Sequence, residues 1–187
     1  MLSTSDLRKG LKYLKDGEPH VIVDFQFVKP GKGQALYKCK LRNLITGSIY
    51  ELTYRSGESF EEANVEERRM QYLFQEDDRY CFMDNSTYDQ IYVPAEAMGE
   101  DALYLTDNIE VDVLMWGEKP IGVTLPNFVE LQITECEPGV RGDTATGATK
   151  IATLSTGATV YVPLFVEQEE WIKIDTRTRA YVERVKK

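Results

Sequence analysis

The sequence has few of the residues from which catalytic and metal sites are usually built. Its 187 residues include one histidine, His20, and three widely spaced cysteines, Cys39, Cys81 and Cys136. One histidine with no GxSxG or HExxH motif offers no familiar catalytic set. An odd number of cysteines without a CxxC pair argues against a disulfide framework or a zinc site. We therefore predict three reduced thiols that act as small core residues, no metal or other cofactor, and no enzymatic activity.

Long apolar runs are also missing. No stretch approaches the roughly 20 apolar residues that a membrane-spanning helix needs. The N-terminal segment from Met1 to Gly17 carries charges throughout and has no apolar region typical of a secretory signal. We therefore expect a cytoplasmic protein that has no membrane partner.

The chain is acidic, with 22 basic and 31 acidic residues and a net charge of −9, which by itself argues against a nucleic-acid partner. The charge is segregated, however. Residues 1–63 carry 10 basic against 8 acidic side chains, residues 64–127 carry 4 against 14, and residues 128–187 carry 8 against 9. No acid falls between Asp24 and Glu51, an interval that holds Lys29, Lys32, Lys38, Lys40 and Arg42. This interval is either a phosphate-binding patch or a solvated strand face, and composition leaves both possibilities open.

Alternation of apolar and polar residues predicts an all-β fold of short strands with frequent turns. In one such stretch, Val21, Val23, Phe25 and Phe27 are expected to share a face. The stretches from Ile109 to Met115 and from Val129 to Thr134 also alternate. Helical signals are weak and short: 94–98, 100–105, and a stretch 5–14 that Gly10 interrupts.

An internal repeat suggests how the chain is divided. Residues 86–94 (STYDQIYVP) align without gaps on residues 155–163 (STGATVYVP), with five of nine positions identical. The repeat predicts two similar small β-domains. We expect three domains of about 60 residues, at 1–63, 64–127 and 128–187, each with a small core.

The segment from Phe27 to Leu36 predicts a hairpin whose tip carries an exposed lysine. Pro30 presets φ for an early turn position, and Gly31 and Gly33 can take positive φ at little cost. Lys32 is flanked by these glycines, so nothing shields its ammonium group. Such a lysine is a good target for a modifying enzyme, although the same pattern also suits an ordinary surface turn.

These residues resemble the bacterial elongation factor P family, and the resemblance runs over essentially the whole chain. Its most specific segments are 28–35 (VKPGKGQA), 138–145 (PGVRGDTA), 152–158 (ATLSTGA) and 162–166 (VPLFV). Residues 126–131 (PNFVEL), Tyr181-Val182 and Arg184-Val185 match as well.

The resemblance implies three small β-barrels, a KOW/SH3-like barrel followed by two OB-folds, in an L-shaped arrangement similar to transfer RNA. It implies a non-enzymatic factor that enters the 70S ribosome between the peptidyl (P) and exit (E) tRNA sites. There the factor would contact ribosomal RNA and the P-site peptidyl-tRNA, and would relieve stalling at consecutive prolines.

The resemblance also assigns roles to residues. Lys32 becomes the residue that a lysine-modifying enzyme extends, with a β-lysyl or aminopentanol group left open beside an unmodified lysine. Pro30, Gly31 and Gly33 would shape the tip, and Lys29 would contact phosphate. The predicted RNA-binding residues on the following strand are Lys38, Lys40 and Arg42.

One loop departs from the family pattern. Where some members have a Gly-Asp-Asn-Ala-type loop near the exit-site codon, this chain has Gly99-Glu100-Asp101-Ala102. Codon contact and a simple turn with surface acids both remain open for it.

A generic OB-fold protein that binds single-stranded nucleic acid is the alternative. It would need a basic groove with stacking aromatic residues. Residues 64–127 supply the aromatic residues but carry a net charge of −10, from 4 basic and 14 acidic side chains.

Overall fold

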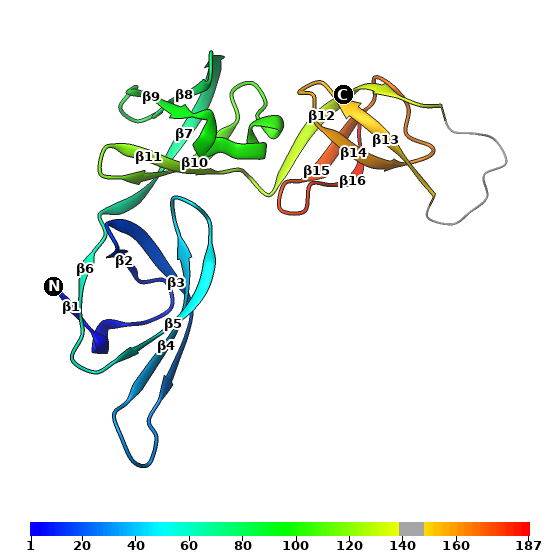
Figure 1. The fold of residues 1–187 in the computed structure, drawn as a ribbon. Helices are drawn as coiled ribbons and strands as arrows, with labels where there is room; N and C mark the ends of the chain where they lie inside the picture. The colour runs from blue at the N-terminus through cyan, green and yellow to red at the C-terminus, as the bar shows by residue number, and fades with distance from the viewer. Residues whose placement is uncertain (139–147) are drawn as a thin grey trace. The chain divides into compact units, whose positions relative to one another are not determined.

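The computed structural model describes residues 1–138 and 148–187, and short strands arranged in three sheets dominate it (Figure 1). The all-β prediction is confirmed. Of the resembling segment 138–145, all but Pro138 lies outside the described residues. No helix in the described ranges is long and apolar enough to cross a membrane.

The first sheet has six strands in the order β1-β6-β2-β3-β4-β5. Their bounds are β1 Leu2–Ser3, β2 Lys12–Lys15, β3 Glu18–Val28, β4 Leu36–Asn43, β5 Ile49–Arg55 and β6 Ser59–Glu62. The core of this sheet is built around Tyr13, Ile22 and Leu41, which are at most 1% exposed. The weak helical signal over 5–14 gives no α-helix: only the 3-10 turn η1, Thr4–Asp6, forms before Gly10 takes a φ of 91° and β2 begins.

A β-bulge changes the expected face of β3. Ile22 pairs with Leu41 and Asp24 pairs with Lys40, so one residue of β3, Val23, has no partner between them. An inserted residue reverses which side chains point inward. Ile22 is therefore fully buried before the bulge and Phe25 packs against the core after it. The prediction that Val21, Val23, Phe25 and Phe27 share one face is wrong for this reason.

The second and third sheets have the same topology, which agrees with the sequence repeat. The second sheet has the order β11-β10-β7-β8-β9, and the third the order β14-β13-β12-β15-β16. In each sheet, the strand that comes first in the chain, β7 or β12, lies at the centre. The next two strands in the chain lie on one side of it and the last two on the other side. The bounds are β7 Val65–Glu76, β8 Arg79–Met83, β9 Gln90–Pro94, β10 Glu110–Trp116, β11 Lys119–Thr124, β12 Phe128–Cys136, β13 Thr149–Leu154, β14 Thr159–Pro163, β15 Trp171–Asp175 and β16 Ala180–Val185.

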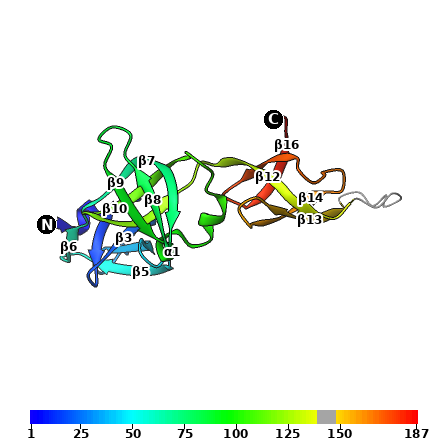
Figure 2. The ribbon, with the colours of Figure 1, turned by 90° about the horizontal axis from the view of Figure 1, so that it is seen from above.

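The repeated sequence falls on equivalent edge strands. Val93 of β9 and Val162 of β14 are both fully buried, and each follows an exposed tyrosine, Tyr92 or Tyr161. Each strand pairs with the preceding strand of its own sheet, as Figure 2 shows for β13 and β14. In the third sheet, contacts between β14 and β16 bring the two edges together.

The predicted short helices are found near Pro94. Helix α1, Ala95–Met98, follows Pro94, and the 3-10 helix η2 covers Gly99–Tyr104. The expected alternation of β10 and β12 is also confirmed: Val111, Val113 and Met115 are buried on β10, and Val129, Leu131 and Ile133 on β12.

All three cysteines are free, and two of them are core residues as predicted. Cys39 and Cys81 are buried, and Cys136 is half-buried. By compactness the chain forms two units, residues 1–68 with 113–122 and residues 69–112 with 123–187. The three-domain boundaries at 63 and 127 stay a prediction.

Candidate functional site

The candidate site begins at the end of a long two-stranded arm. Strands β3 and β4 remain paired as far as Val28 and Leu36, and Figure 1 shows their hairpin, in blue, projecting beyond the rest of the first sheet. Residues 29–35 connect the strands, so the hairpin lies where the sequence predicts it, between Phe27 and Leu36.

The tip presents Lys32 without shielding. Lys29, Pro30, Gly31, Lys32 and Gly33 are all exposed, and a Cβ added to either glycine would meet no atom within 4 Å. Gly33 has a φ of 121°, a conformation that other residues rarely adopt, whereas Gly31 is not at positive φ. The tip therefore needs one glycine for its backbone, and both glycines leave space around the lysine. The modification of Lys32 stays a prediction.

Three aromatic residues stabilise the arm, and none of them is among the site residues predicted from the sequence. Phe27 pairs with Tyr37 across the strands, with ring centroids 5.1 Å apart, and Tyr37 also stacks on Phe25 at 6.3 Å. Cross-strand aromatic pairs stabilise a hairpin beyond its hydrogen bonds. Phe27 remains 51% exposed, so it contributes to the arm and not to the core. The available signal was the spacing of Phe27 and Tyr37, which lie five residues before and five residues after Lys32.

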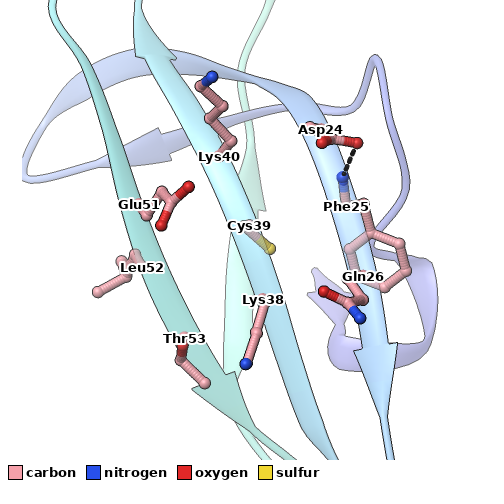
Figure 3. Close-up of a pocket in the computed structure, with 9 residues that line it drawn as sticks. All are labelled: Asp24, Phe25, Gln26, Lys38, Cys39, Lys40, Glu51, Leu52 and Thr53. Atoms are coloured by element: carbon pink, nitrogen blue, oxygen red, sulfur yellow. Dashed lines mark hydrogen bonds between the residues drawn. The ribbon is translucent and has the colours of Figure 1, made fainter.

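The predicted RNA-binding residues lie on one outward face of β4. Lys38, Lys40 and Arg42 are exposed and alternate with the buried residues Cys39, Leu41 and Asn43. The strand period of two therefore brings the three cations together. This face also lines a shallow depression of about 380 Å³ between β3, β4 and β5 (Figure 3).

The three cations are not equivalent, because the sheet places acids beside only one of them. Lys40 is directly opposite Asp24 on β3 and Glu51 on β5, as Figure 3 shows. These are the two acids that bound the acid-free interval in the sequence. The interval forms three adjacent strands, β3, β4 and β5. The two acids at its ends therefore lie on either side of Lys40, which is on the central one of these strands. The basic patch read from the sequence is thus interrupted at Lys40.

The other two cations have uncharged neighbours. Lys38 is opposite Gln26 and Thr53, and Arg42 is opposite Val21 and Ile49. The cross-strand rows of Lys38 and Arg42 each carry a charge of +1, whereas the row that contains Lys40 carries −1. Lys38 and Arg42 are therefore better placed than Lys40 to meet a phosphate group.

Ion pairing distinguishes the first sheet from the rest of the chain. Among the basic residues of 1–63, only Lys15 forms an ion pair within the described structure, with Asp16 at 2.8 Å. In the described parts of 64–187, most basic side chains are paired with acids: Arg68, Arg69, Arg79, Lys173, Arg177, Arg179, Arg184 and Lys187. Free positive charge is therefore concentrated on the first sheet.

Only part of the aromatic set in 64–127 is open to solvent, where the alternative requires a stacking platform: Phe74 and Tyr88 are exposed at 43% and 74%. Tyr72 and Phe82 are core residues at 9% and 0% exposure, and their rings lie 5.6 Å apart. Tyr92 is partly exposed, but the guanidinium of Arg79 covers its ring at 4.0 Å. These contacts favour a structural role over base stacking for Tyr72, Phe82 and Tyr92.

The loop that departs from the family pattern forms the start of η2. Both of its acids bind one side chain, since the guanidinium of Arg179 donates to Glu100 Oε2 and to Asp101 Oδ1. The loop is a helical turn with surface acids, as one of the two interpretations holds. A codon contact by Gly99–Ala102 stays untested.

Comparison with known families accounts for nearly the whole chain. Three family models match it: the elongation factor P KOW-like domain at residues 3–60, the elongation factor P OB domain at 65–123, and the elongation factor P C-terminal region at 129–184. The three matches follow one another in the order of the three sheets.

Curated relatives agree over their full length. The chain is 58% identical over 187 residues to an elongation factor P of Desulfosudis oleivorans and 52% identical over 186 residues to that of Syntrophus aciditrophicus; 100% of each chain is covered in both cases. A solved structure, the eukaryotic translation initiation factor 5A from Methanococcus jannaschii, is similar in fold at a TM-score of 0.51 and 24% identity, over 67% of this chain and 90% of that one. The chain belongs to the elongation factor P family.

Proposed function

We propose that this translation elongation factor binds the 70S ribosome between the P and E sites and promotes peptide-bond formation at runs of proline. In this proposal it acts in the cytoplasm by positioning the P-site peptidyl-tRNA and has no catalytic side chain of its own. The observation that carries the proposal is the arm on the first sheet: it ends at an exposed lysine and lies in the region where free basic charge is concentrated.

The arm suits a reach toward RNA. Lys38 and Arg42 supply uncompensated charge along β4, and Lys29 and Lys32 continue it to the tip. Phosphate contacts give affinity and register without reading sequence, which suits a factor that acts on many tRNAs. The paired cations elsewhere in the described chain limit unspecific attraction to RNA.

Positioning is a sufficient source of rate enhancement. Proline has a locked φ and a stiff ring, so a prolyl acceptor and a prolyl peptide are readily misaligned. Holding two reactants in an attack geometry can remove several kcal/mol of the barrier. An extended amine at the tip would contact the RNA backbone near the reacting end of the tRNA.

The proposal includes covalent extension of Lys32 by a lysine-modifying enzyme. Its support is access: the lysine is exposed and two glycines flank it. A β-lysyl or aminopentanol group would lengthen the side chain and keep a positive charge at its end. The intact mass of protein from its native host tests this step, and a mass equal to the unmodified chain would contradict it.

Lys32→Ala tests the function. The side chain is exposed at the loop tip, so we expect an unchanged melting temperature and loss of stimulated synthesis across consecutive prolines in a reconstituted translation system. Lys119→Ala is the matched control, because Lys119 on β11 is also an exposed lysine that forms no ion pair among the described residues. Full stimulation by the Lys32→Ala protein would refute the proposal.

A further inference from the structure

One arginine carries the ion pairs that join the second and third sheets. Arg179 lies between β15 and β16, and its guanidinium binds Glu100 and Asp101 at the start of η2. No other ion pair among the described residues links segment 65–124 to segment 128–187. All three residues belong to the same compact unit, residues 69–112 with 123–187.

The backbone at Arg179 is unusual. Its φ is 59°, in the left-handed region that disfavours residues with a Cβ. Its N–H donates to the carbonyl of Asp175 at 2.6 Å, which closes the turn. A glycine would adopt this conformation without strain, so the arginine side chain has to offset a local cost. Outliers of this kind persist where the surrounding contacts hold them.

The contacts of the guanidinium offset this cost. Its two terminal nitrogens reach different carboxylates, so one cation relieves the repulsion between two acids that are adjacent in sequence. It also lies 6.0 Å from the ring centroid of Tyr104, a residue that is 4% exposed. The side chains of Arg179, Glu100 and Asp101 are partly exposed, at 41%, 76% and 34%. Single exposed pairs contribute little, but a fork shared by two carboxylates forms a small network.

Neighbouring hydrogen bonds support the same contact. The Thr156 hydroxyl donates to the Leu103 carbonyl, which lies within η2. At the base of the turn, the Thr176 hydroxyl donates to the Pro126 carbonyl and the Thr176 N–H donates to Asn127 O at 2.8 Å. The turn that presents Arg179 is therefore anchored to the connection between the two sheets.

We propose that Arg179 is a positioning residue that latches the third barrel to η2 of the second barrel. Without the Arg179 side chain, the covalent connection between β11 and β12 and the hydrogen bond from Thr156 to Leu103 remain. The ion pairs, however, no longer hold the third barrel against η2. The latch is electrostatic, so high salt weakens it.

Arg179→Gly is the decisive variant. It removes the guanidinium and relieves the strain at φ 59°, and the backbone freedom that glycine adds to the turn is matched in the control. Arg177→Gly is the matched control, since Arg177 lies in the same turn and its contacts stay within the third sheet: an ion pair with Asp175 at 2.8 Å and the ring of Phe128 at 5.5 Å. Arg177 is not at positive φ, so glycine relieves no backbone strain there, and the control disturbs its turn more than Arg179→Gly does.

Residual dipolar couplings of backbone amides in residues 69–112 and 128–187 measure the order. We expect a single alignment tensor for both groups in the unaltered protein and in Arg177→Gly, and two tensors in Arg179→Gly. Raising the salt to about 0.5 M should shift the unaltered protein toward the variant. A single tensor in Arg179→Gly, or equal loss in both glycine variants, would overturn the proposal.

A double-mutant cycle gives an independent readout that a purely local role for Arg179 would not change. Glu100→Gln with Asp101→Asn should reduce the order between the two barrels, measured by the same couplings, as much as Arg179→Gly does. Combining all three changes should cause no further reduction. Additive losses would show that the arginine and the acids act separately, and would also overturn the proposal.

Discussion

The three cations on β4 should contribute unequally to ribosome binding, and their cross-strand neighbours set the order. Alanine at Lys38 or Arg42 changes the charge of its row from +1 to zero. Alanine at Lys40 changes a row that is already −1, because Asp24 and Glu51 stand opposite the lysine. We therefore expect Lys38→Ala and Arg42→Ala to weaken binding more than Lys40→Ala.

The magnitude follows from counterion release. Each phosphate contact contributes about 0.9 to the slope of log affinity against log salt concentration on a duplex. Losing one contact then lowers the magnitude of that slope by about 0.9. The ratio of parent affinity to variant affinity should therefore be about 3.5-fold smaller at fourfold higher salt than at the lower salt. Lys40→Ala should change the slope by well under half that amount, because a phosphate would avoid a row of net negative charge.

The assay is equilibrium binding of fluorescently labelled factor to purified ribosomes between about 50 and 200 mM salt. Each single variant is compared with the parent. Asp24→Asn with Glu51→Gln provides the opposite perturbation: it converts the Lys40 row to +1, and the slope should steepen. If Lys40→Ala lowered the slope as much as Lys38→Ala, or if removing the two acids had no effect, the cross-strand argument would be refuted.

Three further predictions concern the first sheet. Gly33→Ala should cost the tip about 1–2 kcal/mol, because Gly33 has a φ of 121°, and should reduce proline-stall relief, while Gly31→Ala should be nearly neutral in the same assay. Tyr13→Phe removes a buried 2.8 Å hydrogen bond to the Tyr54 hydroxyl, so urea unfolding should show a loss of about 1–2 kcal/mol; no loss would contradict this reasoning. Burial raises the pKa of the Cys39 thiol from 9.0 to about 11, so the folded protein keeps a proton that the unfolded chain releases over this range. The free energy of unfolding should therefore fall as pH rises from about 9 to about 11, and Cys39→Ala should flatten that fall; an equally steep fall in the variant would exclude this thiol as a cause.

Several features of the fold could be predicted from the sequence because they depend on the local pattern of residues. Alternation over Val129 to Thr134 predicted the strand that is β12 in the structure. The Pro-Gly-Lys-Gly segment predicted an exposed lysine at the tip of a hairpin. The nine-residue repeat indicated two similar domains, and the two sheets indeed share one strand order. Period and turn chemistry act over a few residues, so these features require no knowledge of distant contacts.

The sequence by itself determined an all-β chain with an exposed Lys32 and a cluster of basic residues after it. Only the tertiary structure decided which of those cations have acids opposite them. A bulge at Val23 reversed the inward face of β3, and strand pairing brought Asp24 and Glu51 to either side of Lys40. Distant pairing likewise placed Arg179 against Glu100, 79 residues away in the chain. Cross-strand register and long-range contact set the electric field at a side chain, and neither is encoded in the residues beside it.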